Sequence, residues 1–145
     1  MVEIPDSERL YRRVLSGRGQ VMRDSGGRLR ISSMAFEDRG RKPSVDRESL
    51  CAGGAEWTRQ DPANGVLAFH TGEVRAIDTV VQRDARGREV AQHHIEVEPA
   101  PLDENPAHCQ IVPSPEYQGE GAFRKLREAL ALLAVVQIAP RDVRD

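Results

Sequence analysis

The clearest pattern of hydrophobic and polar positions lies towards the C-terminal end of the sequence. Between residues 121 and 140 a series recurs at helical spacing, made of Phe123, Leu126, Leu130, Leu133 and Gln137. Such spacing places its members on one side of a helix. Pro140 lacks an amide hydrogen and is expected to end the helix. The pattern therefore predicts a long C-terminal helix that packs one side against a core.

Alternating patterns upstream predict strands. The stretches with strand character are residues 29–34, 66–81, 91–98 and 107–112. Gly72 is expected at a bulge or bend, and the polar segment between Val81 and Val90 has the composition of a hairpin turn. Alternation along the third stretch predicts one shared face for Ala91, His93, Ile95 and Val97.

The N-terminal third predicts short helices. Residues 7–16 begin with a fair N-cap serine and place Leu10 and Val14 four apart, which favours a helix, although the same residues also fit a strand. Asp46 is expected to cap a second short helix near residues 47–52. By the layer rule, the whole pattern predicts a single α+β domain spanning residues 1–145. Its mostly antiparallel sheet would carry the long C-terminal helix on one face, beside one or two short N-terminal helices.

Composition narrows the class of protein. The chain has 145 residues, of which 39% are hydrophobic and 30% charged, which suits one ordinary domain with its own core. The net charge of −2 disfavours broad attraction to nucleic acid or anionic lipid, while leaving specific nucleic-acid contacts open. No apolar run approaches the ~18–20 residues that span a membrane, and because the first residues lack an apolar stretch we expect no signal peptide. We therefore expect a cytoplasmic protein with Cys51 and Cys109 as free thiols.

The sequence carries no motif for a bound cofactor or metal. Zinc sites usually show ligands paired two to four residues apart, whereas His93 and His94 are adjacent on a predicted strand and would point to opposite faces. His108 and Cys109 have the same arrangement. The glycines match neither of the common phosphate-binding loops. We accordingly expect no cofactor and no metal site.

His108 is the centre of one hypothesis, in which the protein is a small enzyme. His108 would act as general acid or base, oriented by Asp46 or Glu96, while Arg12 or Arg47 holds a phosphate. Such a site could act on RNA or a nucleotide without a metal. The candidate catalytic residues are His108, Arg12, Ser33, Asp46 and Arg47.

The same histidine also has a structural interpretation. In the segment Asn105–His108, Asn105 and Pro106 would form a turn, and the imidazole would cap a backbone group. This alternative assigns His108 no chemistry.

A second enzymatic pattern is that of one class of ADP-ribosyltransferases, which combine an arginine on the first strand, a Ser-x-Ser strand and a Glu-x-Glu motif. Here Arg12, Ser32-Ser33 and Glu96-Val97-Glu98 follow in that order. The match is incomplete, because the two serines are adjacent and the chain between them and Arg12 is short for the intervening helices. Alternating glutamates are also ordinary on a solvated strand face.

Three segments together resemble a group of small uncharacterised bacterial proteins. They are Leu10–Val14 (LYRRV), Ile31–Arg47 (ISSMAFEDRGRKPSVDR) and Asn105–Ile111 (NPAHCQI). In that group an LYRR-like start is followed by an SSxAF segment, an SVD segment and a late NPAH segment. The resemblance implies no activity, cofactor or partner. It draws attention to Arg12, Ser32, Ser33, Asp46, Arg47, Asn105 and His108.

Two functions are therefore weighed. The first is a non-catalytic accessory domain that binds another protein, favoured because no catalytic motif stands out. The alternative is a small enzyme centred on His108, nuclease-like or ADP-ribosyltransferase-like. Apolar residues beyond the main helical stripe also predict a homodimer through the C-terminal helix; they are Ala131, Leu132, Val135 and Val136.

Overall fold

The computed structural model describes residues 3–143 of the chain. Its strands are β1 (Arg9–Val14), β2 (Val21–Arg23), β3 (Leu29–Ile31), β4 (Ser44–Arg47), β5 (Gly65–His70), β6 (Val81–Arg83), β7 (Glu89–Gln92), β8 (His94–Pro99), β9 (His108–Ser114) and β10 (Val135–Ile138). The α-helices are α1 (Ala55–Arg59), α2 (Thr71–Arg75) and α3 (Glu120–Leu133), and the 3-10 helices are η1 (Ser33–Phe36) and η2 (Glu48–Leu50). Within these residues, none of the helices has the length and apolar character that crossing a bilayer requires.

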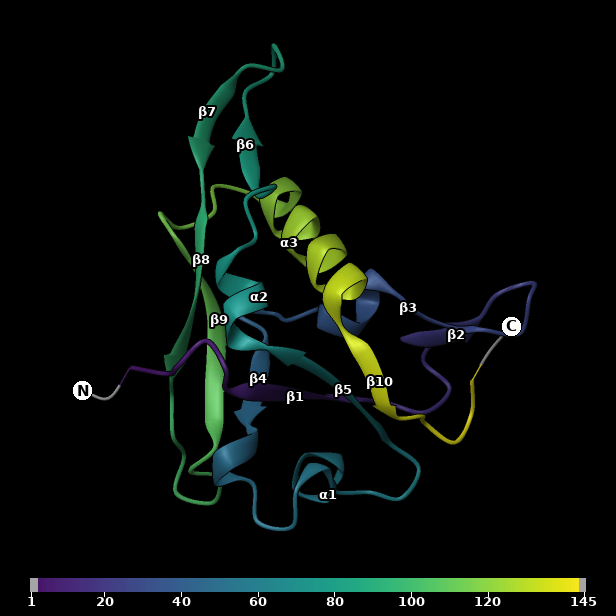
Figure 1. The fold of residues 1–145 in the computed structure, drawn as a ribbon. Helices are drawn as coiled ribbons and strands as arrows, with labels where there is room; N and C mark the ends of the chain where they lie inside the picture. Colours follow the sequence, from purple (N-terminus) through teal and green to yellow (C-terminus); the bar gives the residue numbers. More distant parts are fainter. Residues whose placement is uncertain (1–2, 144–145) are drawn as a thin grey trace.

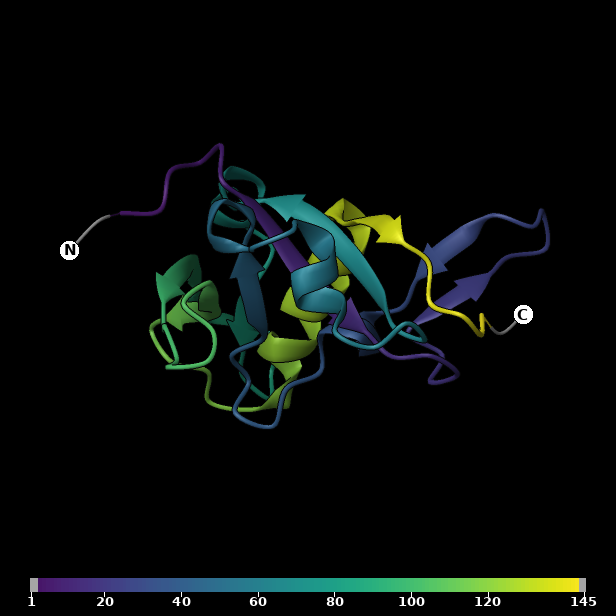
Figure 2. The ribbon, with the colours of Figure 1, turned by 90° about the horizontal axis from the view of Figure 1, so that it is seen from below.

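A six-stranded sheet forms the centre of the molecule, in the order β10-β5-β1-β4-β9-β8. All of its ladders are antiparallel. Helix α3 lies across one face, as Figure 1 shows. The short helix α1 lies on the other face, in front of β1 and β5 when the molecule is seen from below (Figure 2). The predicted α+β class, with an antiparallel sheet, a C-terminal helix on one face and short N-terminal helical pieces, is confirmed.

The main core lies between the sheet and α3. Helix α3 has 14 residues and buries Phe123, Leu126 and Leu130 against the sheet, where each side chain is at most 2% exposed. Burial of one such side chain is worth about 1.5–3 kcal/mol. The sheet meets them with alternate residues of its strands, including Leu10 and Val45. This face of the sheet is called the α3 face below.

The helix expected over residues 7–16 is wrong, because these residues contain β1. Leu10 and Val14 point into the main core, while Tyr11 lies on the opposite face in a smaller apolar cluster. Six residue pairs join β1 to β5, so tertiary pairing decides between two local patterns that the sequence allowed. Asp46 likewise lies within β4 rather than at a helix cap.

The C-terminal helix is shorter than predicted. It ends at Leu133, and Ala134 turns extended with φ −77° and ψ 153°. Residues expected to continue the helix form β10, which pairs with β5 at the edge of the sheet. The β-branched side chains of Val135, Val136 and Ile138 favour strand geometry, and β5 offers a free edge to pair with.

The stretch from residue 66 to 81 divides into β5, α2 and the start of β6. Gly72 therefore lies in the first turn of α2 rather than at the predicted bulge. Its amide donates to the carbonyl of Asp6, and a Cβ here would lie 3.0 Å from the Cβ of Asp6. The glycine thus allows a close approach of the N-terminal segment.

The predicted hairpin and the strand expected at residues 107–112 are confirmed, whereas the stretch from residue 91 to 98 divides into β7 and β8, which belong to different sheets. β6 and β7 form the predicted hairpin, and β9 covers the expected C-terminal strand. His93, Ile95 and Val97 are buried on one side of the chain, as the alternation indicated, whereas Ala91, expected on the same face, lies in β7 and is only half-buried. Strand β3 is shorter than expected, because Ser33 begins η1.

Two small hairpins, β2–β3 and β6–β7, project from the body (Figure 1) and share the pattern V-x-R-D-x-x-G-R. In each tip an aspartate accepts two backbone amides through its side chain. Asp24 accepts from Gly26 and Arg28, and Asp84 accepts from Arg86 and Arg88. Gly27 and Gly87, one in each tip, have φ of 79° and 78°, which glycine adopts readily because it has no Cβ.

Candidate functional site

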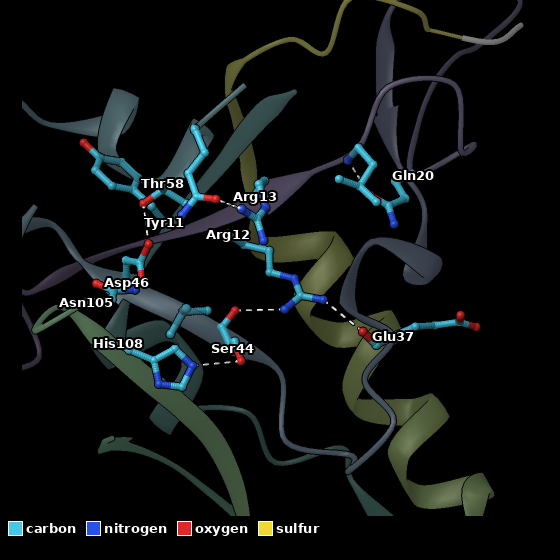
Figure 3. A pocket seen from close by; sticks show the side chains of 13 residues that line it. Tyr11, Arg12, Arg13, Gln20, Glu37, Ser44, Asp46, Thr58, Asn105 and His108 are labelled. Carbon is cyan, nitrogen blue, oxygen red and sulfur yellow. Dashed lines mark hydrogen bonds between the residues drawn. The ribbon is translucent and has the colours of Figure 1, made fainter. Parts of the chain in front are cut away.

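A cavity of about 310 Å³ opens beside β1 and β4. Alternation along the strands places the side chains of Arg13, Ser44, Asp46 and His108 on the face opposite the α3 face, and all four line this cavity. The loop after β8, helix α1 and the chain after β1 supply the remaining walls. Figure 3 shows these side chains converging from several elements.

The cavity exists because two central strands pair only briefly. β1 and β4 are joined at Leu10–Arg47 and Tyr11–Asp46, whereas β1 pairs with β5 along its whole length. Beyond the second pair the ladder of β1 and β4 ends, and the side chain of Arg12 reaches across. An Nη atom of Arg12 donates to the carbonyl of Ser44 at 2.9 Å. The guanidinium thus satisfies a carbonyl at the point where the ladder stops.

Arg12 is held by backbone carbonyls rather than by an acid. Besides Ser44, it donates to the carbonyls of Ala35 at 3.0 Å and Glu37 at 2.9 Å. Within residues 3–143 it forms no ion pair. Burial lowers the pKa of Arg12 from its ordinary value, while Asp38 acts in the opposite direction. Arginine stays protonated in proteins, so a positive charge without a paired carboxylate borders the cavity.

His108 is fixed by two hydrogen bonds in the cavity wall. Its Nδ1 lies 2.7 Å from the carbonyl oxygen of Ala100. A carbonyl only accepts, so Nδ1 carries the proton of the neutral ring. The other nitrogen, Nε2, lies 3.0 Å from the Oγ of Ser44 and accepts from this hydroxyl. A serine hydroxyl therefore faces a basic nitrogen, and a backbone group rather than a carboxylate orients the ring.

Asp46 lies across from His108 in the ladder between β4 and β9. Its carboxylate accepts from the hydroxyl of Thr58 at 2.8 Å and from the amide of Asn105 at 2.9 Å. The carbonyl oxygen of the Asn105 side chain in turn accepts from the indole of Trp57 at 3.0 Å. Asp46 is 8% exposed, and this network satisfies its buried charge.

Two further side chains border the cavity from β1. Arg13 donates to the side-chain oxygen of Gln60 in α1's C-terminal loop. The Tyr11 hydroxyl donates to Glu48 at 2.7 Å, and burial together with this acid raises the pKa of Tyr11 to about 12. The cavity rim thus adds a second cation and a phenol that stays protonated at neutral pH.

Of the candidate catalytic residues, the structure brings Arg12, Asp46 and His108 to one cavity. Arg47 lies outside it and pairs with Glu8, with 2.9 Å between Nε and Oε1. Ser33 begins η1, also outside the cavity lining.

Glu96 lies away from His108 and forms an ion pair with Arg75 at 2.6 Å. It is therefore not the residue that orients the imidazole. For the same reason, the ADP-ribosyltransferase pattern does not assemble, because its glutamate and Arg12 face different surroundings.

The sequence interpretation missed Ser44, the hydroxyl that contacts His108. It belongs to the SVD segment and precedes Asp46 by two positions, so strand periodicity would have placed both on one face. Thr58 and Arg13 were also missed. Neither carries a signal in the sequence, because their roles depend on how α1 packs beside β1.

The cysteines belong to the interior. Cys51 and Cys109 are free and buried, and burial raises the pKa of each thiol to about 11. They are therefore poor nucleophiles at neutral pH. Within residues 3–143, no group of three or more His, Cys, Asp or Glu side chains is arranged to hold a metal ion.

Comparisons with known proteins give no relative. No family model, no curated protein and no solved structure matches the chain. The candidate site therefore rests on its own geometry: a fixed Ser–His contact, a satisfied aspartate and an arginine held by backbone carbonyls around one cavity.

Proposed function

We propose that this protein is a small enzyme that acts on a phosphate-bearing substrate, a nucleotide or an RNA, in the cavity beside β1 and β4. The observation that carries the proposal is the pair of hydrogen bonds at His108, to Ala100 and Ser44. They leave Nε2 as the basic nitrogen and aim it at a hydroxyl in the cavity wall. General acid–base catalysis needs such an imidazole within hydrogen-bonding reach of the proton that it moves.

The charge of Arg12 supports an anionic substrate. Three of its five N–H groups donate to carbonyls, which leaves two for a ligand. Arg12 is half-buried, and it forms no ion pair within residues 3–143, so its charge is only partly hydrated. A phosphate in the cavity would offset this loss of hydration, because the guanidinium fork matches phosphate oxygens. The Glu37 carboxylate does not compete, since it points away from the guanidinium of Arg12 (Figure 3) and accepts from Arg127.

The size and lining of the cavity support a small polar substrate. Its volume of about 310 Å³ lies at the lower end of the ~300–1,000 Å³ found for small-molecule sites. Gln20 and Gln60 also line it, and their amides can hydrogen-bond the edges of a base. A nucleotide, or one nucleotide of an RNA, fits these features better than a large apolar ligand.

The proposal is tested by turnover of phosphate esters. We expect the purified chain to hydrolyse a substrate in a panel of bis(4-nitrophenyl) phosphate, nucleotides and short RNAs. His108→Ala should lower turnover about 100- to 10,000-fold, the usual contribution of a general acid or base. His94→Ala, on the exposed part of β8, is the matched control and should leave turnover unchanged. Equal turnover by both variants, or none by the unaltered chain on any substrate, would contradict the proposal.

A second candidate function, binding of a partner protein, is favoured by a different surface. Leu132 is 89% exposed and Val135 is 56% exposed, next to each other where α3 passes into β10. β10 is an edge strand of the sheet. Two copies of an antiparallel edge can pair around a two-fold axis, which makes a second copy of this chain the partner that fits. A cytoplasmic location is also proposed, supported by the free state of both cysteines.

A further inference from the structure

We propose that Ser44 is the nucleophile of this site and forms a covalent phosphoseryl intermediate, an inference that rests on the proposed function. Its Oγ lies 3.0 Å from Nε2 of His108, and the Ala100 carbonyl fixes which ring nitrogen is free. An activated serine requires a hydroxyl, a base in contact with it and a third group that orients the base. All three are present around Ser44.

The other hydroxyls of the cavity are committed elsewhere. Thr58 donates its hydroxyl proton to Asp46 at 2.8 Å, inside the buried network. Tyr11 donates to Glu48, and its pKa is raised to about 12, which disfavours the phenolate. Among the residues that line the cavity, Ser44 is therefore the hydroxyl that contacts a basic nitrogen.

The charges around Ser44 suit a developing phosphoryl group. The guanidinium of Arg12 is anchored to the carbonyl of Ser44 itself, at 2.9 Å, so the cation and the hydroxyl are fixed relative to each other. Figure 3 shows Ser44 between the imidazole and the guanidinium. Asp46 is the cross-strand partner of His108, and such partners have Cβ atoms about 5 Å apart. Its negative charge stabilises the imidazolium that forms when the serine loses its proton.

The reaction balances with water as the second reactant. In the first step Ser44 Oγ attacks the phosphorus of a phosphodiester, and its proton passes to Nε2 of His108. The bond from phosphorus to the leaving ester oxygen breaks, and the imidazolium protonates that oxygen, so that it departs as an alcohol. In the second step water attacks the phosphoseryl group, gives a proton to Nε2, and the serine oxygen leaves and recovers that proton. No electron is gained or lost.

A fluorophosphonate tests the nucleophile directly, since attack at phosphorus expels fluoride and leaves a stable adduct. We expect intact-mass and peptide mass spectrometry of the full chain to show one adduct, on Ser44. Ser44→Ala should not be labelled, and His108→Ala should be labelled about 100-fold more slowly or less. Ser114→Ala removes an exposed serine of β9 and should be labelled at the rate of the unaltered chain. Circular dichroism melting of each variant verifies that it is folded.

The outcomes separate this inference from the proposed function. If the chain turns over phosphate esters but forms no adduct, and Ser44→Ala keeps that turnover, Ser44 is not the nucleophile. The general acid–base role of His108 then stands. If Ser44 forms the adduct but no phosphate ester is turned over, Ser44 is an activated nucleophile, and the proposal of a phosphate-bearing substrate is wrong. Labelling of other serines at the same rate, or labelling independent of His108, also overturns the inference.

Discussion

Arg12 occupies the position where the ladder between β1 and β4 ends, and it takes over part of that ladder's function. It joins β1 to η1 and β4 through three backbone carbonyls. Hydrogen bonds from a charged donor contribute about 1.5–3 kcal/mol each, and unsatisfied buried carbonyls are costly. The residue is therefore expected to support the fold as well as the site.

Exchange of Arg12 tests this structural role. Arg12→Lys keeps the charge but replaces the planar fork by one ammonium, so that the carbonyls cannot all be satisfied. We expect a loss of about 3 kcal/mol in the free energy of unfolding, measured by urea denaturation. Arg13→Lys, at the exposed neighbouring position, should change it by less than about 0.5 kcal/mol. Equal stability of the two variants would mean that Arg12 does not hold the strands together.

At the scale of elements, the two hairpins show how a local motif sets its own geometry. Asp24 and Asp84 each accept backbone amides from their own turn, and these bonds lower the pKa of both carboxyls. The largest contributions come from the amides of Arg28 and Arg88. Both tips are thus stabilised by contacts within a few residues, which explains why the hairpin at residues 81–90 was predictable.

The hairpins should respond to acid. A depressed pKa in the folded state contributes stability that is fully present above the ordinary value of 3.8 and is lost as the pH falls through the folded value. We expect carboxyl NMR titrations of Asp24 and Asp84 to have midpoints below 3.8. Asp24→Asn should speed amide exchange in β2–β3 while β6–β7 serves as the unaltered control. A midpoint at or above 3.8 would contradict the turn geometry.

The boundary between α3 and β10 shows the opposite case, in which packing overrides the local pattern. β10 crosses β5 so closely that a Cβ on Gly65 would lie 2.4 Å from the carbonyl oxygen of Ile138. It would also lie 2.6 Å from the nitrogen of Pro140. The register at this edge thus requires a glycine on the neighbouring strand, information that lies about seventy positions away in the sequence.

Gly65→Ala should therefore displace β10. We expect a loss of about 2–3 kcal/mol in the free energy of unfolding, the cost of overpacking against backbone, measured by thermal and urea denaturation. Gly121→Ala is the control, because a Cβ at that position of α3 meets nothing within 4 Å. It should leave stability unchanged or raise it by up to about 1 kcal/mol, since alanine favours helix. If Gly65→Ala has the same free energy of unfolding as the unaltered chain, β10 does not approach β5 as closely as the structure shows.

At the scale of the whole molecule, the exposed pair Leu132 and Val135 and the edge strand β10 predict self-association. We expect light scattering over a range of protein concentrations to show a dimer. Leu132→Glu should give a monomer, because it places a charge in the apolar contact. Val90→Glu alters a valine on the β6–β7 hairpin that is about as exposed as Val135, and it should leave the dimer intact. A monomeric unaltered chain would remove this interface.

The sequence by itself determined only part of the local structure. Alternation and helical spacing were sufficient for the α+β class, the C-terminal helix and the hairpin at residues 81–90, because periodic burial and turn chemistry are read within a few residues. Residue type was sufficient to select Arg12, Asp46 and His108, since charged groups and imidazoles are chemically distinctive. It also selected Arg47 and Ser33, which lie outside the cavity, because residue type carries no information on which surface a side chain reaches.

Only the tertiary structure decided what surrounds those residues. The ladder of β1 and β4 stops after two pairs. The end of this pairing opens the cavity and leaves room for the Arg12 side chain to hydrogen-bond to β4. Ser44 meets His108 because β4 and β9 are neighbours, although 64 positions separate them in the sequence. Strand order and register depend on contacts between distant segments, whose free energy is not encoded in any one stretch of the chain.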